Sequence, residues 1–218
     1  MPTKFYFSSS DIARVNPPFS GNVSGWNGTT GATRYMMYPF KKNTSIATGN
    51  TINLNDAASS FHLDRQYISQ PLNQSGVVSG LCSGFLMVRE YATQDNVERI
   101  CCCLRVFDYK CTGQRGIVVK LSGFGTTAEF VNAVTHRNKV ILSGVLTNRI
   151  TGQRGDRLVL EIGYTSTVGG TTSQASAIWG DAAADLPMNE TQTTFGAGWF
   201  SINCNLSFKT GNYFSSFS

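Results

Sequence analysis

The chain has 218 residues, of which 41% are hydrophobic and only 14% charged, and its formal net charge is +5. Its 14 Phe, 8 Tyr and 3 Trp exclude a disordered chain, because disordered segments are rich in charge and poor in aromatics. The basic residues are scattered, with Lys41-Lys42 as the only adjacent pair, which argues against the basic stripe of a nucleic-acid-binding domain.

The start of the chain predicts neither export nor membrane insertion. Met1–Phe7 lack the apolar run of a signal peptide. No stretch approaches the roughly 18 apolar residues that span a bilayer. We therefore expect a protein made in a cytoplasm, with no membrane or nucleic-acid partner.

The first 60 residues differ in texture from the rest. Pro17-Pro18 and several glycines surround Trp26, and Pro-Pro favours extended chain. We assign residues 1–60 to a loop-rich N-terminal arm with the first strands, and residues 61–218 to a β-sandwich body of the same domain.

Two strands in the body have the clearest patterns. In residues 156–164 the apolar side chains alternate onto one face, as in a half-buried antiparallel strand: Leu158, Leu160, Ile162 and Tyr164. Residues 98–110 repeat this pattern with Ile100, Cys102, Leu104 and Val106. Their opposite face, Cys101, Cys103, Arg105 and Phe107, is only partly polar, so we expect both sides to be covered.

The remaining elements complete an all-β reading. Further strands are expected at 4–7, 33–38, 45–54, 64–70, 77–90, 117–123, 139–147, 174–180 and 197–208. Two segments are the candidates for a short helix, Thr127–Val134 and Asp181–Leu186. Strands that recur without amphipathic helices between them predict an antiparallel β-sandwich of jelly-roll type.

One pentapeptide occurs twice, as Thr112-Gly-Gln-Arg-Gly116 and as Thr151-Gly-Gln-Arg-Gly155, each time before a strand. Its glycines permit the positive φ of a tight turn. Two interpretations stay open: a reused turn, or a pair of loops that contact one ligand.

Catalytic patterns are absent from the sequence. Only His62 and His136 could serve as a histidine base, and no Gly-x-Ser-x-Gly elbow exists. Asp181 and Asp185, with Glu190 beyond them, are the pair of acids of most interest; we interpret Asp181 as a turn cap, with a calcium site as the alternative. We therefore predict no enzyme, no cofactor and no metal.

The six cysteines follow neither a disulfide framework nor a zinc pattern. Cys101, Cys102 and Cys103 point to alternating faces of a strand, so they cannot all bind one metal. We interpret all six as free thiols that act as small hydrophobes. We place Trp179 and Trp199 in the core, and leave Trp26 open between core and interface.

Several segments together resemble the β-sandwich structural proteins of tailed bacteriophages. The resemblance spans nearly the whole chain and rests on Trp26, Ala32–Arg34, Met36-Met37, Gln70–Leu72, the strand from Ser79, Arg115-Gly116, residues 155–164, Ile178–Asp181, Asp185-Leu186 and Gly198–Phe200. It implies a jelly roll in the virion, as a head-decoration, fibre or tail-associated protein. The cysteine run 101–103 departs from the family.

The resemblance leads to a structural subunit that acts through protein–protein contacts, located in the virion. Its partners are other virion proteins and further copies of itself, with a trimer as one option. The alternative is a receptor- or glycan-binding module of a tail fibre, with a host surface glycan as partner. The uncharged ends of the chain supply the interface candidates: Pro17, Pro18, Phe19, Trp26, Tyr213 and Phe214.

Overall fold

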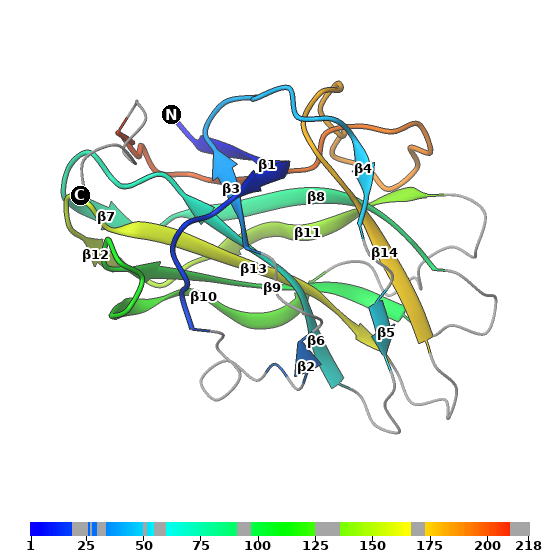
Figure 1. Ribbon diagram of the computed structural model, residues 1–218, viewed down its shortest axis with the longest axis horizontal. Coiled ribbons are helices and arrows are strands. Elements are labelled where there is room, and N and C mark those ends of the chain that lie inside the picture. Colours follow the sequence, from blue (N-terminus) through cyan, green and yellow to red (C-terminus); the bar gives the residue numbers. More distant parts are fainter. Residues whose placement is uncertain are drawn as a thin grey trace.

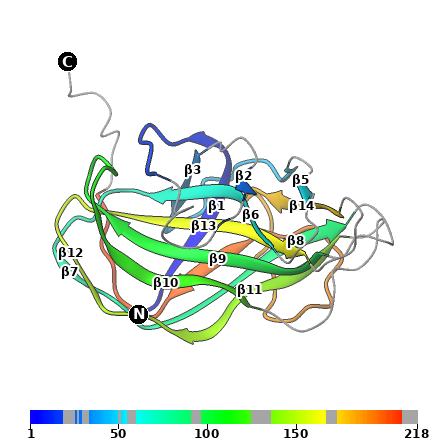
Figure 2. The ribbon, with the colours of Figure 1, turned by 90° about the horizontal axis from the view of Figure 1, so that it is seen from below.

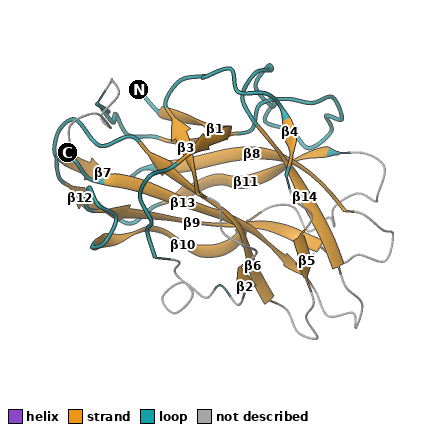
Figure 3. Ribbon diagram, in the orientation of Figure 1, coloured by secondary structure: helices purple, strands orange, loops and turns teal. Residues whose placement is uncertain are grey.

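The computed structural model describes residues 1–18, 26, 28–29, 34–49, 52–54, 60–90, 97–124, 136–166 and 173–209. Within these ranges the chain forms strands, turns and loops and no helix (Figure 3). The predicted all-β class is confirmed. None of the described residues belongs to a helix long and apolar enough to cross a membrane.

The strands of the described residues follow in this order: β1 (Thr3–Ile12), β2 (Gly28–Thr29), β3 (Arg34–Tyr38), β4 (Ala47–Thr48), β5 (Ile52–Leu54), β6 (Ser60–Ser69), β7 (Gly76–Val78), β8 (Leu81–Glu90), β9 (Val97–Phe107), β10 (Gln114–Phe124), β11 (Arg137–Leu146), β12 (Ile150–Gly152), β13 (Arg157–Ser166), β14 (Ser173–Trp179) and β15 (Trp199–Ile202).

One continuous sheet bends round to form both layers of a sandwich (Figure 1). The first layer has the order β10-β9-β13-β6-β3. In the second layer, β15 and β14 pair with successive parts of one edge of β8. β11 pairs with the opposite edge of β8. β12 and β7 form a separate two-stranded sheet at one end.

Strand β1 joins the two layers because it pairs on both sides. Tyr6 is opposite Tyr38 of β3 on one side and opposite Trp199 of β15 on the other. Its alternation places Phe5 and Phe7 in the core, where both side chains are fully buried. The N-terminal strand is therefore an interior strand of the sheet.

The predicted inward faces are confirmed. Leu158, Leu160, Ile162 and Tyr164 of β13 lie in the main core with Ile100, Cys102, Leu104 and Val106 of β9. The opposite face of β9 is also buried, as predicted: Cys101, Cys103, Arg105 and Phe107. The N-terminal arm supplies part of that cover.

At the far side of the sandwich the layers meet without pairing as strands. β10 and β11 run side by side there (Figure 2). Asn148 links them, because its backbone N–H donates to Val118 O at 2.9 Å and its side chain to Ile117 O at 3.1 Å. On β11, the Val140 N–H donates to the Glu190 carboxylate at 3.0 Å, so that edge is partly capped.

Several expectations change in detail. β3 and β2 run parallel to β6, so the sheet is mixed rather than wholly antiparallel. The expected strand 45–54 is two short strands, β4 and β5. The jelly-roll strand order stays a prediction.

The expected helix at Asp181–Leu186 is wrong. The backbone N–H groups of Asp181 and Leu186 donate to Thr44 O and Ala197 O, in two other segments, which leaves no helical ladder. The other expected helix, Thr127–Val134, lies outside the described residues.

Candidate functional site

The outer face of the first layer is partly covered by the N-terminal arm. Trp26 is only 4% exposed and packs against Leu63 and Cys101. Its ring lies over Gly163, where a Cβ atom would approach the Trp26 ring to 2.7 Å. The indole N–H donates to Glu161 at 2.9 Å. Trp26 thus attaches the arm to the first layer of its own chain and is too buried to contact a neighbouring molecule.

Glu161 is the centre of a buried polar network, which we call the arm anchor: Trp26, Arg34, Gln66, Arg105 and Glu161. The Glu161 carboxylate also accepts a hydrogen bond from Gln66 at 2.8 Å and one from Arg105. Arg105 is 2% exposed and Glu161 is fully buried, so each charge depends on the other for compensation.

The same arginines hold the Pro17-Pro18 segment. Arg34 donates to Pro17 O at 3.2 Å and Arg105 to Pro18 O at 2.8 Å. Of the predicted interface residues, Pro17 is buried and Pro18 exposed. Phe19, Tyr213 and Phe214 lie outside the described residues. The sequence signal for the anchor was an Arg and a Glu within two apolar strands. The face of Arg105 was correctly expected to be covered, whereas the face of Glu161 was expected to be the open side of a half-buried strand.

The outer face of the second layer is partly covered by the segment from Gly180 to Gly198. Leu186 packs there on Phe85, Met87 and Trp199, and the Trp199 indole donates to Leu186 O at 2.8 Å. Trp179 is 1% exposed and lies in the main core. Both predictions of core tryptophans are confirmed.

Asp185 fixes that covering segment to β1. Lys4 and Lys41 donate to its carboxylate at 2.9 and 2.7 Å, and the Tyr6 hydroxyl at 3.0 Å. Partial burial alone would raise the pKa of Asp185, but the hydrogen bonds from Lys41, Lys4 and Tyr6 outweigh it and lower the pKa. Burial and the bond to Asp185 raise the pKa of Tyr6 to about 12.

Asp181 caps a neighbouring segment rather than its own turn. Its carboxylate accepts the Thr44 N–H at 2.6 Å and the Thr44 hydroxyl at 2.7 Å. Glu190 pairs with Lys139 at 3.3 Å. The described residues contain no group of three or more His, Cys, Asp or Glu that could hold a metal ion.

The two histidines lie in different layers. His62 is on β6, and His136 precedes β11. His136 is buried against the edge of Phe195, with ring centroids 5.3 Å apart. Burial, and then the charge of Arg89, lower its pKa to about 4. His136 is therefore neutral near pH 7.

The cysteines are free thiols, as predicted. Cys101, Cys102 and Cys103 are all fully buried. Burial raises the pKa of the Cys102 thiol well above its ordinary value, so it stays protonated and unreactive.

An uncovered part of the second layer exposes two leucines. Leu81 of β8 and Leu146 of β11 are direct partners in the antiparallel register. Their neighbours Cys82 and Val145 face the core, so the two leucines face outward. They are 48% and 78% exposed. We call them the leucine pair.

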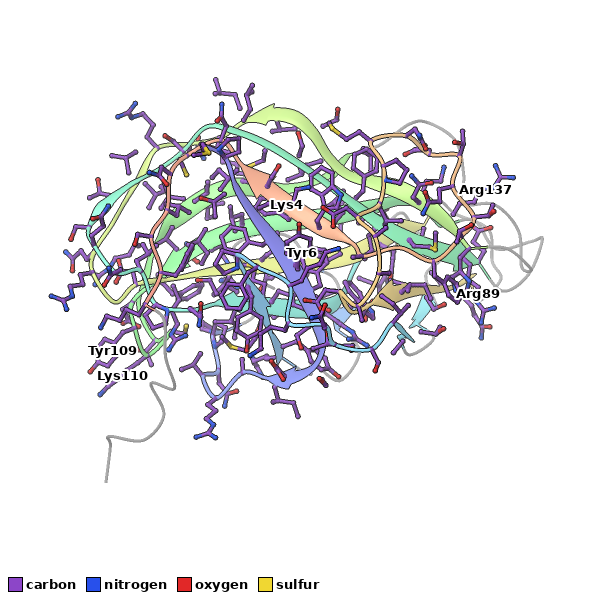
Figure 4. All side chains as sticks on the ribbon, turned by 90° about the horizontal axis from the view of Figure 1, so that it is seen from above. Lys4, Tyr6, Arg89, Tyr109, Lys110 and Arg137 are labelled. Atoms are coloured by element: carbon purple, nitrogen blue, oxygen red, sulfur yellow. The ribbon has the colours of Figure 1, made fainter. Side chains whose placement is uncertain are left out.

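The two copies of the repeated pentapeptide contact each other at one end of the molecule. Arg115 of the first copy donates to Gln153 of the second at 3.2 Å, and to Asp156 just after it at 3.2 Å. Tyr109 lies beside Gly155, whose φ is +95°. Tyr109 and Lys110 project from this end, and Arg89 and Arg137 from the opposite end (Figure 4).

No protein-family model matches the chain, and no curated protein matches it. Among solved structures, a CocE/NonD family hydrolase from Staphylococcus aureus aligns at 7% identity and a TM-score of 0.48, over 93% of this chain and 36% of its own. An α-amino acid ester hydrolase aligns at 7% identity and a TM-score of 0.38, over 92% of this chain and 36% of its own.

The structure of infectious bursal disease virus, strain Gx, aligns at 13% identity and a TM-score of 0.23, over 78% of this chain and 47% of its own. The chain thus spans about a third of the length of the hydrolases and half that of the viral protein.

The prediction that the chain is not an enzyme is corrected, because the hydrolases above align over more than nine-tenths of its length. The prediction is withdrawn. The likeness assigns no activity to this chain, and the proposals below do not depend on the presence or absence of one.

Proposed function

We propose that the chain is a structural subunit of a bacteriophage particle and that it works by binding further copies of itself and other virion proteins. The resemblance to phage β-sandwich proteins supports the class. The leucine pair carries the proposal, because its two large apolar side chains lie together and face outward, as at the centre of a protein–protein contact.

The surroundings of the leucine pair suit a neighbour rather than water. The side chains beside it on the outer face are small or uncharged, namely Ser83, Ser143, Ser201 and Asn203. A neighbour would therefore lose little charge hydration on binding, and interface centres are depleted in charged residues. On the first layer, the described arm residues Trp26, Pro17 and Pro18 cover part of the outer face.

The oligomeric state tests the proposal. Leu81→Asp and Leu146→Asp each place a charge in the proposed contact, which should weaken self-association about 30-fold or more. Size-exclusion chromatography with light scattering should show an oligomer for the wild type and a monomer for each variant. Their melting temperatures should stay close to that of the dissociated wild type, since both side chains are exposed in the single chain.

Thr193→Asp adds the same charge at an exposed position near the other end of β11, where the neighbouring Gln192 N–H donates to Asn138, and should leave the oligomer intact. Mass spectrometry of purified particles checks the virion assignment. A wild type that is monomeric at all concentrations and missing from particles would overturn the proposal.

A further inference from the structure

The end of the molecule that carries the repeated pentapeptide has a composite surface. We call it the paired-turn surface and define it as Tyr109, Lys110, Arg115, Gln153 and Arg154. Its first two residues come from the β9–β10 hairpin and its last two from the turn before β13. Arg115 ties the two turns together through its bonds to Gln153 and Asp156.

Both turns are held rigidly from behind. Asp108 accepts the backbone N–H groups of Thr112 and Gly113 at 2.9 and 2.8 Å. In the second turn, Asp156 accepts the Gln153 N–H at 2.8 Å. The Arg154 N–H donates to Ser75 at 3.1 Å. The side chains of the surface therefore project from a fixed backbone, which lowers the entropy cost of binding a ligand.

The surface carries uncompensated positive charge. Among the described residues, no carboxylate lies within ion-pair distance of Lys110 or Arg154. Arg157, behind them, is buried and donates only to the carbonyls of Tyr109 and Ser69. The two acids present, Asp108 and Asp156, are already bound by backbone N–H groups and Arg115.

The paired-turn surface also carries an exposed aromatic ring. Tyr109 is 54% exposed. The Lys110 ammonium lies 5.5 Å from the centroid of the ring. A Cβ atom at Gly155 would lie 3.6 Å from the Cβ atom of Tyr109. The neighbouring turn therefore has no side chain at Gly155 to cover the ring.

From this combination we propose that the paired-turn surface binds an acidic saccharide. The C–H face of a sugar ring packs on Tyr109. The Gln153 amide offers hydrogen bonds to hydroxyls, and the Arg154 guanidinium and Lys110 ammonium pair with the acid group. A nucleic acid would need a continued row of cations, and an acidic peptide would not need the ring. This role is additional to the proposed structural function and independent of it.

Titration calorimetry with defined oligosaccharides tests the proposal. The probes are uronate, sialylated and sulfated oligosaccharides, with a neutral galacto-oligosaccharide and a hexaglutamate peptide as comparisons. At least one acidic saccharide should bind. Tyr109→Ala and Arg154→Gln should each weaken it about tenfold or more. Tyr109→Phe keeps the ring and should bind nearly as well as the wild type.

Lys120→Gln is the matched control for Arg154→Gln. It removes the same charge from an exposed position on β10 and should leave the affinity unchanged. Equal loss in both variants would reduce the effect to net charge and overturn the proposal. So would equal binding of the neutral sugar or the peptide, or no binding of any acidic probe. The structural role is tested separately, by the oligomeric state of the chain, so failure of this proposal would leave it standing.

Discussion

Asp64 is a buried acid whose pKa is raised by the fold. It is the extra residue of a bulge in β6, where Leu63 pairs with Gly163 and Arg65 with Ile162. Its carboxyl accepts the Tyr164 hydroxyl at 2.9 Å, and Arg65 lies 3.9 Å away. Burial raises the pKa of Asp64 to about 6, more than the Arg65 charge and the Tyr164 hydrogen bond lower it.

This pKa has a measurable consequence for stability. Between pH 4 and 6 the folded chain holds a proton on Asp64 that the unfolded chain has released. The stabilisation is complete below the unfolded pKa of 3.8 and is lost as the pH rises through about 6. The free energy of unfolding of the wild type, relative to that of Asp64→Asn, should therefore fall by about 2 kcal/mol from pH 4 to pH 7.

Urea unfolding of both proteins across that range measures the difference. The variant is needed as reference because the pKa of His136 is lowered to about 4. Its contribution to the free energy of unfolding therefore rises with pH over the same range. Tyr164→Phe removes a bond that lowers the pKa of Asp64, so it should move the transition to higher pH. A difference that does not vary with pH would contradict the assignment.

Residue-level prediction from the sequence succeeded where alternation decides burial and failed where a partner lies far along the chain. Trp179 and Trp199 follow from strand patterns. The half-buried pattern of residues 156–164 implied an open second face, yet Glu161 on that face is fully buried, because its partners Arg105 and Trp26 come from other segments. No local pattern specifies such a pairing.

At the scale of elements, the arm depends on one buried ion pair. Glu161→Gln leaves the Arg105 charge buried without its partner, which should cost about 3–5 kcal/mol. The double variant Arg105→Met with Glu161→Gln removes both charges and should recover most of that loss. Urea unfolding of the three proteins decides this. A double variant no more stable than Glu161→Gln would show that the pair acts through something other than charge compensation.

Strand positions could be predicted because alternating side chains and glycine-rich turns mark them locally. The parallel pairing of β3 with β6 and the splitting of 45–54 could not, since both depend on which strand lies next to which. The Asp181–Leu186 segment has the composition of a short helix, but its N–H groups bond to distant carbonyls. Tertiary hydrogen bonds replaced the local ladder.

For the whole molecule, closure of the sandwich requires both ends of the described chain. β1 joins the layers by pairing with β15, where Thr3 is opposite Ile202. The sheet therefore cannot be completed until nearly the whole chain is available, and contacts between such distant segments make folding slow. β15 also contributes Phe200 and Ile202 to the core.

Truncation tests this dependence on β15. A chain ending at Gly198 lacks β15 and leaves β1 and β8 without their shared neighbour. It should show no cooperative unfolding transition in urea, with near-UV circular dichroism as the readout. A chain ending at Lys209 keeps every described strand and should unfold cooperatively. If Tyr213 and Phe214 bind a neighbour, as the sequence predicts, this longer truncation should fold normally and self-associate more weakly. Cooperative unfolding of the shorter chain would mean that β1 closes the sandwich without β15.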